Sequence, residues 1–188
     1  MEELFDFQAL WVIQPGHVQP NRAKYQIFGP DRQLLATAAE TERRNRINLI
    51  SRPLQGSGVL AIVTAAGDPL LTMIRQHTEW LTEIQDPDGS VVGRIRTGGT
   101  RRHYTLLDES GETVGKVVGD LGLKKFAVTD ASGGGLASVR KTRAGLFKEM
   151  LTTNDHYKVE FIGPVSQQLR TLVAMVPIVL DLTLYEPA

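Results

Sequence analysis

Three short runs of arginine and lysine are the residues in this sequence best suited to bind a ligand. They are Arg43-Arg-Asn-Arg46, Arg101-Arg-His103 and Arg140-Lys-Thr-Arg143. Guanidinium and ammonium groups form charge-assisted hydrogen bonds with phosphate oxygens and are attracted to anionic surfaces. If the three loops meet at one end of the fold, their cations form one headgroup-binding patch. The candidate residues are Arg43, Arg44, Arg46, Arg101, Arg102, Arg140, Lys141 and Arg143.

The charge of the chain is balanced overall but unevenly distributed. With 21 basic and 21 acidic residues, the net charge is zero, which argues against a dedicated nucleic-acid-binding protein. Residues 91–150 hold 11 lysines and arginines against 6 aspartates and glutamates, an excess of five positive charges. This basic segment could attract phosphates or an anionic membrane surface. The alternative is that its cations are solvated side chains on strand edges and turns.

No other cluster in the sequence supports an enzyme or a metal centre. Residues 56–61 match a dinucleotide-binding fingerprint, but a strand-like run follows where that site needs a helix. The four histidines lack metal-ligand spacing and are expected on the surface: His17, His77, His103 and His156. Asp86 and Asp88 form a carboxylate pair that a tight turn ending at Gly89 explains. We therefore predict a non-enzymatic protein with no cofactor.

A segment near the C-terminus predicts a buried helix over residues 166–185. Ser166 suits the N-cap position, and the unbroken apolar run from Leu172 to Leu180 leaves no polar face. Such a helix lies in a protein core or in a membrane. Pro177 removes one backbone hydrogen bond and predicts a kink or a local break. A length of about 28 Å nearly suffices to span a bilayer, but the charge of Asp181 argues against a span.

The rest of the chain reads as short strands separated by turns. Three hairpins repeat one pattern, an Asp-rich turn closed by glycine, at Asp86-Pro-Asp-Gly89, Asp108-Glu-Ser-Gly111 and Asp130-Ala-Ser-Gly133. Hairpins in series predict an antiparallel meander, and closure into a barrel around the helix hides the strand edges. Alternation over residues 156–161 predicts that Tyr157, Val159 and Phe161 face inward and His156 outward.

Length and composition predict one domain, residues 1–188, in a reducing compartment. A chain of 188 residues suits one ordinary core, and it contains no cysteine for a disulfide. The acidic start, Met1-Glu-Glu3, lacks the basic region of a secretory signal peptide. We therefore expect a cytoplasmic protein.

Several motifs in a fixed order carry a resemblance to a known family. They are Lys24-Tyr-Gln-Ile-Phe28, Glu83-Ile-Gln-Asp-Pro-Asp-Gly89, Thr153-Asn-Asp-His-Tyr157 and Val179-Leu-Asp-Leu-Thr-Leu-Tyr-Glu186. With these motifs the chain resembles the phospholipid scramblases and the related LURP-one-related and tubby-like proteins, from about residue 10 to residue 186. The resemblance implies a mainly β, tubby-like fold: a closed antiparallel barrel of about twelve strands around a central hydrophobic C-terminal helix.

The same resemblance implies phospholipid movement or phosphoinositide binding at the cytoplasmic face of a membrane. We therefore predict a peripheral membrane or lipid-headgroup-binding protein at the inner membrane face, whose partner is anionic phospholipid and not nucleic acid. The alternative is a soluble barrel that binds a protein partner or a small ligand and has no lipid role.

The chain departs from the scramblase branch of this group in two ways. It has no cysteine that could be acylated, and the acidic stretch expected before the helix is reduced to Asn154 and Asp155. Calcium prefers six to eight oxygen ligands, usually with several carboxylates. We therefore expect no calcium requirement and keep Asn154 and Asp155 as weak candidates for a calcium site.

Overall fold

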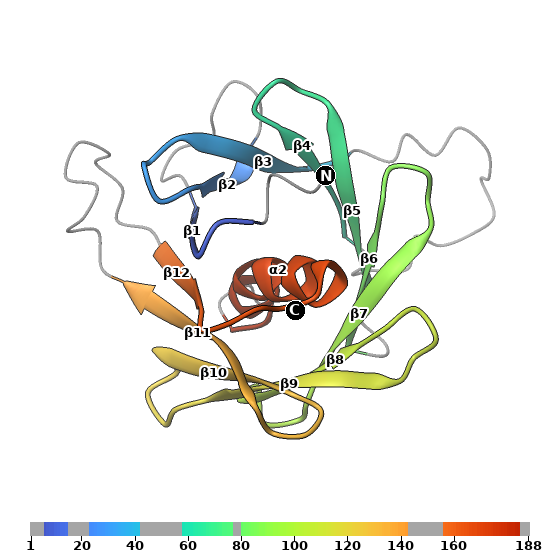
Figure 1. Cartoon of the computed structure of the whole chain (residues 1–188). Helices are drawn as coiled ribbons and strands as arrows, with labels where there is room; N and C mark the ends of the chain where they lie inside the picture. Colours follow the sequence, from blue (N-terminus) through green and yellow to red (C-terminus); the bar gives the residue numbers. More distant parts are fainter. Residues whose placement is uncertain (1–5, 15–22, 42–57, 77–79, 143–155, 185–188) are drawn as a thin grey trace.

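Twelve antiparallel strands form one closed barrel with a helix inside it (Figure 1). The computed structural model describes residues 6–14, 23–41, 58–76, 80–142 and 156–184. Its elements are β1 (Ala9–Ile13), β2 (Ala23–Phe28), β3 (Leu34–Glu40), β4 (Val59–Thr64), β5 (Pro69–Gln76), β6 (Leu81–Gln85), β7 (Val91–Thr97), β8 (His103–Leu107), β9 (Thr113–Gly119), β10 (Lys125–Asp130), β11 (Gly135–Thr142), β12 (His156–Phe161) and α2 (Gln167–Leu184). The predicted fold class is confirmed.

The barrel is a continuous meander that its first and last strands close. Each strand pairs with the next one in the sequence, and β1 also pairs with β12, where Leu10 lies opposite Val159. Every strand therefore has two hydrogen-bonded neighbours, which leaves no open edge for other chains to join. Because successive strands run in opposite directions, the connections that the structure describes lie at one or the other end of the barrel.

The turns at one end follow a repeat of 22 residues. Gly67, Gly89, Gly111 and Gly133 adopt positive φ angles between 91° and 95°, a conformation that glycine adopts with little strain. In the third of these turns, Asp108 Oδ1 accepts hydrogen bonds from the backbone N–H groups of Ser110 and Glu112, each at 2.9 Å. Asp130 holds the next turn in the same way. The Asp-to-Gly turns predicted from the sequence are thus confirmed.

Helix α2 begins at a capped N-terminus and continues without interruption to Leu184. The Leu169 N–H donates to Ser166 Oγ at 3.4 Å, as expected of an N-cap. Of the kink or local break predicted at Pro177, the break is wrong, because the helix continues through this residue, and the kink stays a prediction. A proline costs about 3 kcal/mol in a helix interior, whereas burial of each large apolar side chain stabilises the fold by about 1.5–3 kcal/mol. Many such side chains on α2 outweigh the single lost hydrogen bond.

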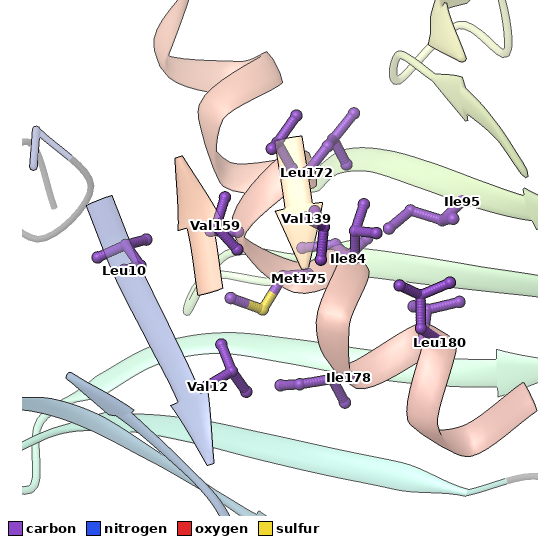
Figure 2. Close-up of a cluster of buried hydrophobic side chains, with 14 of the residues drawn as sticks. Leu10, Val12, Ile84, Ile95, Val139, Val159, Leu172, Met175, Ile178 and Leu180 are labelled. Atoms are coloured by element: carbon purple, nitrogen blue, oxygen red, sulfur yellow. The ribbon is translucent and has the colours of Figure 1, made fainter. Parts of the chain in front are cut away.

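Side chains from the whole barrel wall converge on the helix. Figure 2 shows Leu10 and Val12 of β1 together with Val159 of β12, beside Met175 and Ile178 of α2. Residues on every face of the helix are buried, including most positions from Leu169 to Leu182. The helix therefore fills the interior of the barrel and forms the centre of its core.

Glycine in two strands lets the wall approach the helix closely. A Cβ atom on Gly93 of β7 would lie 2.5 Å from the carbonyl oxygen of Leu107 and 3.0 Å from Leu172 Cδ1. A Cβ atom on Gly115 of β9 would lie 2.7 Å from the carbonyl oxygen of Thr129. These positions, again 22 residues apart, have no room for a side chain.

A buried carboxyl group lies in the C-terminal half of α2. Asp181 is 2% exposed, and Tyr25 Oη donates a hydrogen bond to Asp181 Oδ2 at 2.8 Å. Within the described residues, α2 is the one helix long and apolar enough to cross a membrane, and 78% of it is buried inside the barrel. Its apolar surface is therefore already covered by protein in this structure.

The outward orientation predicted for His156 is wrong. Its exposed fraction is only 2%, and it begins β12 opposite Ile13 of β1 and Thr142 of β11. The inward orientation of Tyr157, Val159 and Phe161 is confirmed. Among the other histidines, His103 is exposed as predicted, whereas His17 and His77 lie outside the described residues.

Gly93→Ala should lower the free energy of unfolding by about 1–3 kcal/mol, because the new methyl group would lie 2.5 Å from the Leu107 carbonyl oxygen of β8 and also crowd Leu172 of α2. Gly99→Ala is the matched control, since a Cβ atom there meets nothing within 4 Å. Urea denaturation of both variants measures the effect. Equal stability of the two would contradict the close packing described for Gly93.

Tyr25→Phe should lower the free energy of unfolding by about 1–3 kcal/mol, because the buried Asp181 Oδ2 loses this hydrogen bond. Tyr104→Phe is the control, since Tyr104 Oη donates to a partly buried acceptor, the Arg101 carbonyl, at 3.0 Å. Thermal unfolding should show a larger drop in Tm for the Tyr25 variant than for the Tyr104 variant.

Candidate functional site

The two ends of the barrel carry opposite charges. At the end where α2 begins, the hairpin turns are rich in carboxylates, and we call this the acidic end. Its turn residues are Asp31, Asp68, Asp86, Asp88, Asp108, Glu109, Glu112 and Asp130. At the opposite end, where α2 finishes, the described turns and strand ends are rich in cations, and we call this the basic end. Its cations are Arg101, Arg102, Lys124, Lys125, Arg140 and Lys141.

The cations of the basic end come from three neighbouring chain segments. The Arg102 carbonyl accepts a hydrogen bond from the Gly119 N–H at 2.7 Å, which joins the β7–β8 turn to the end of β9. Lys125 of β10 lies opposite Arg140 of β11 in the barrel wall. The Lys141 N–H donates to the Lys124 carbonyl at 2.8 Å. The six positive charges therefore form one continuous arc along the rim.

One carboxylate lies within this arc and holds its central turn. Asp120 Oδ1 accepts hydrogen bonds from the backbone N–H groups of Lys124 and Lys125, at 2.8 and 3.3 Å. These bonds, and next the positive charges of Lys125 and Arg102, keep the pKa of Asp120 below its ordinary value. The carboxylate is thus occupied by the backbone, while the side chains of Lys124 and Lys125 are exposed to solvent.

Half of the sequence-predicted cations are among the described residues, and the structure brings these together. Arg101, Arg102, Arg140 and Lys141 all lie on the basic end. The remaining candidates, Arg43, Arg44, Arg46 and Arg143, lie outside the described residues. Sequence reasoning missed Lys124 and Lys125, although the Gly-Leu-Lys-Lys run over residues 122–125 was a usable signal for a basic turn.

Exposed apolar side chains accompany the cations. Leu121, at the tip of the β9–β10 turn, is 88% exposed, and Trp80, just before β6, is 49% exposed. The Trp80 carbonyl accepts a hydrogen bond from the Thr97 N–H at 2.8 Å, which places Trp80 beside the turn that holds Arg101. Nothing in the sequence distinguished these two residues from apolar residues of the core.

A small hollow of about 10 Å³, enough for about one water molecule, opens at this end beside the last turn of α2. It is lined by Arg75, Gln76, Trp80, Leu81, Thr82, Thr97 and Thr183. Ligand pockets usually measure about 300–1,000 Å³, so this hollow is small for a carried ligand. In the part of the chain that the structure describes, no three metal-ligating side chains come together. Asn154 and Asp155 lie outside that part, so the calcium expectation stays a prediction.

The carboxylates of the acidic end are engaged in their own turns. The Ser110 and Ser132 side chains donate to Asp108 and Asp130, and they hold the pKa of each carboxyl below its ordinary value of 3.8. Asp86 differs, because hydrogen bonding with Asp88 raises its pKa. Most of these turn carboxylates are therefore ionised at neutral pH, which keeps this end negative.

Comparisons with known proteins agree with this architecture. A family model described as Scramblase matches residues 16–187. The chain is similar to a protein from Arabidopsis thaliana whose X-ray structure has a TM-score of 0.54 and 12% sequence identity, over 92% of this chain and 91% of that chain. Since the identity is low, this likeness shows the fold alone. A comparison with curated proteins found no match.

The turn carboxylates predict how stability depends on pH. Because the folded pKa of Asp108 lies below 3.8, its ionised form stabilises the fold above that pH, and this contribution is lost on acidification through the folded pKa. Asp108→Asn should therefore be less stable than wild type at neutral pH, with the difference shrinking toward about pH 2.

Asp86→Asn is the contrasting variant. Because the folded pKa of Asp86 is raised, its protonated form is the one that stabilises the fold. This contribution is present at low pH and disappears as pH rises through the folded pKa, so Asp86→Asn should lose no stability at neutral pH. Urea denaturation at several pH values measures both variants. Parallel pH profiles for Asp108→Asn and wild type would contradict the assignment.

Proposed function

Because this chain belongs to the scramblase family, we propose that it is a non-enzymatic, peripheral protein that binds anionic phospholipid headgroups through its basic end. The observation that carries the proposal is the arc of six cations along one rim of the barrel, opposite a rim of carboxylates. Phosphate oxygens are good acceptors for such side chains. The proposed location is the anionic inner face of a membrane, approached from the cytoplasm.

The burial of α2 determines which kind of contact is available. The apolar face of the helix packs inside the barrel and is not free to enter a bilayer. Electrostatic attraction then supplies most of the binding, at about 1 kcal/mol for each lysine or arginine near an anionic surface. The separation of charge also orients the protein, because an anionic surface attracts the basic end and repels the acidic end.

Arg43, Arg44, Arg46 and Arg143 belong to the proposal as additional cations from the same basic motifs. Their contribution rests on the sequence alone. Neither a metal ion nor a catalytic group is needed for this contact, since the cations meet the phosphates directly.

Wild-type protein should co-sediment with vesicles of phosphatidylcholine and phosphatidylserine, and not with phosphatidylcholine alone. Lys124→Glu combined with Lys125→Glu should weaken this binding by about 30-fold or more, because two favourable cations of about 1 kcal/mol each become repulsive. Binding should also fall steeply toward 1 M salt, where the screening length is about 3 Å.

The matched control reverses two exposed cations away from the basic end, Arg32→Glu in the β2–β3 turn with Lys116→Glu in the middle of β9, and so changes the net charge by the same amount. If both double variants lose vesicle binding equally, binding depends on the net charge of the protein and not on the basic end. Binding that survives 1 M salt would point to insertion of α2 instead. A protein that binds no vesicle at all would favour a soluble barrel with a protein partner.

A further inference from the structure

Apolar side chains project from the basic end next to its cations. Leu121 precedes Lys124 and Lys125 in the same turn and is 88% exposed. Trp80 is about half exposed and lies beside the β7–β8 turn that holds Arg101. Leucine is stabilised in hydrocarbon, and tryptophan is enriched where a membrane meets water. This pairing of apolar tips with cations is complementary to the surface of an anionic bilayer.

Larger side chains occupy the described left-handed positions of the basic end. At the acidic end, glycine occupies the left-handed position of four turns and Arg32 (φ 61°) that of another. At the basic end, the left-handed residues are Trp80 (φ 52°), Arg101 (φ 54°) and Leu123 (φ 51°). Leu123 packs against the core. Arg101 is exposed, and its carbonyl accepts a hydrogen bond from Tyr104 Oη at 3.0 Å.

We propose that the barrel docks end-on onto an anionic phospholipid bilayer, with Leu121 and Trp80 entering the interface between headgroups and acyl chains. This inference rests on the proposed function and adds the orientation of the protein to it. The cations of the basic end contact the phosphates around the two apolar side chains, and the acidic end faces away from the membrane. Two side chains bury too little surface to hold the barrel alone, so the cations remain necessary.

The two tryptophans of the chain allow a direct test. Trp11→Phe leaves Trp80 as the single fluorophore, whereas Trp80→Phe leaves Trp11, which lies half-buried on the barrel wall with Lys158 Nζ 5.4 Å from its ring centroid. With phosphatidylcholine–phosphatidylserine vesicles brominated in the acyl chains, Trp80 emission should shift to the blue and be quenched. Trp11 emission should change little. Equal quenching of both, or none of Trp80, overturns end-on docking.

A pair of exposed apolar residues at opposite ends provides the second test. Leu121→Asp should weaken binding to the same vesicles by about tenfold or more, because the side chain no longer enters the interface. Ile162→Asp is the matched control, since Ile162 is 66% exposed and follows β12 at the acidic end. Circular dichroism checks that both variants remain folded. Equal affinities of the two variants overturn the role of Leu121.

Two arginines in the same left-handed conformation provide the third test. Arg101→Gly should relieve backbone strain and so leave Tm unchanged or higher, while it weakens vesicle binding about fivefold. Arg32→Gly relieves the same kind of strain at the acidic end (φ 61°) and should leave vesicle binding unchanged. Loss of binding in both variants, or in neither, contradicts a specific role for Arg101.

The outcomes separate this inference from the function on which it rests. If the wild type fails to sediment with anionic vesicles, the proposed function falls and the docking orientation falls with it. If the wild type binds and the Lys124 and Lys125 reversal weakens it, but Trp80 is not quenched, only the end-on inference fails.

Discussion

The burial of α2 is the constraint on which the rest of this structure depends. A helix that is apolar on every face must be enclosed completely, and a closed barrel does this while pairing every strand edge. The close packing of neighbouring strands and α2 then requires Gly93 and Gly115, where no side chain fits. The buried carboxyl group of Asp181 accepts a hydrogen bond from Tyr25 in this interior. In this structure the same enclosure covers most of the helix with protein.

Because the strands of the wall pack around the helix, the turns at the two ends of the barrel are where residue types can differ. At the acidic end, aspartate holds turns and glycine closes four of them, so these residues serve the fold first. At the basic end, the described left-handed positions hold larger side chains, as one position at the acidic end also does. Positive charge is concentrated on the basic rim. The two ends of the barrel therefore differ in charge, and the proposed membrane contact depends on this difference.

Most of the strands and the helix could be predicted from the sequence because their signals are local. Period-two alternation, turn residues and an N-cap are each read from a few neighbouring residues. The errors arose where distant residues decide the outcome. Pro177 stays within a continuous helix because the barrel surrounds it, and His156 is buried because β1 and β11 flank it. Neither neighbour is adjacent in the sequence.

The sequence by itself determined a β-rich chain with a buried C-terminal helix, and it identified basic runs suited to phosphate. It did not determine that Arg101, Arg102, Arg140 and Lys141 share one rim, because that depends on which strand ends meet when the barrel closes. Leu121 and Trp80 look like core residues in the sequence, since hydrophobicity does not report exposure. Their position beside the cations was decided only by the tertiary structure, through the alternating direction of twelve paired strands.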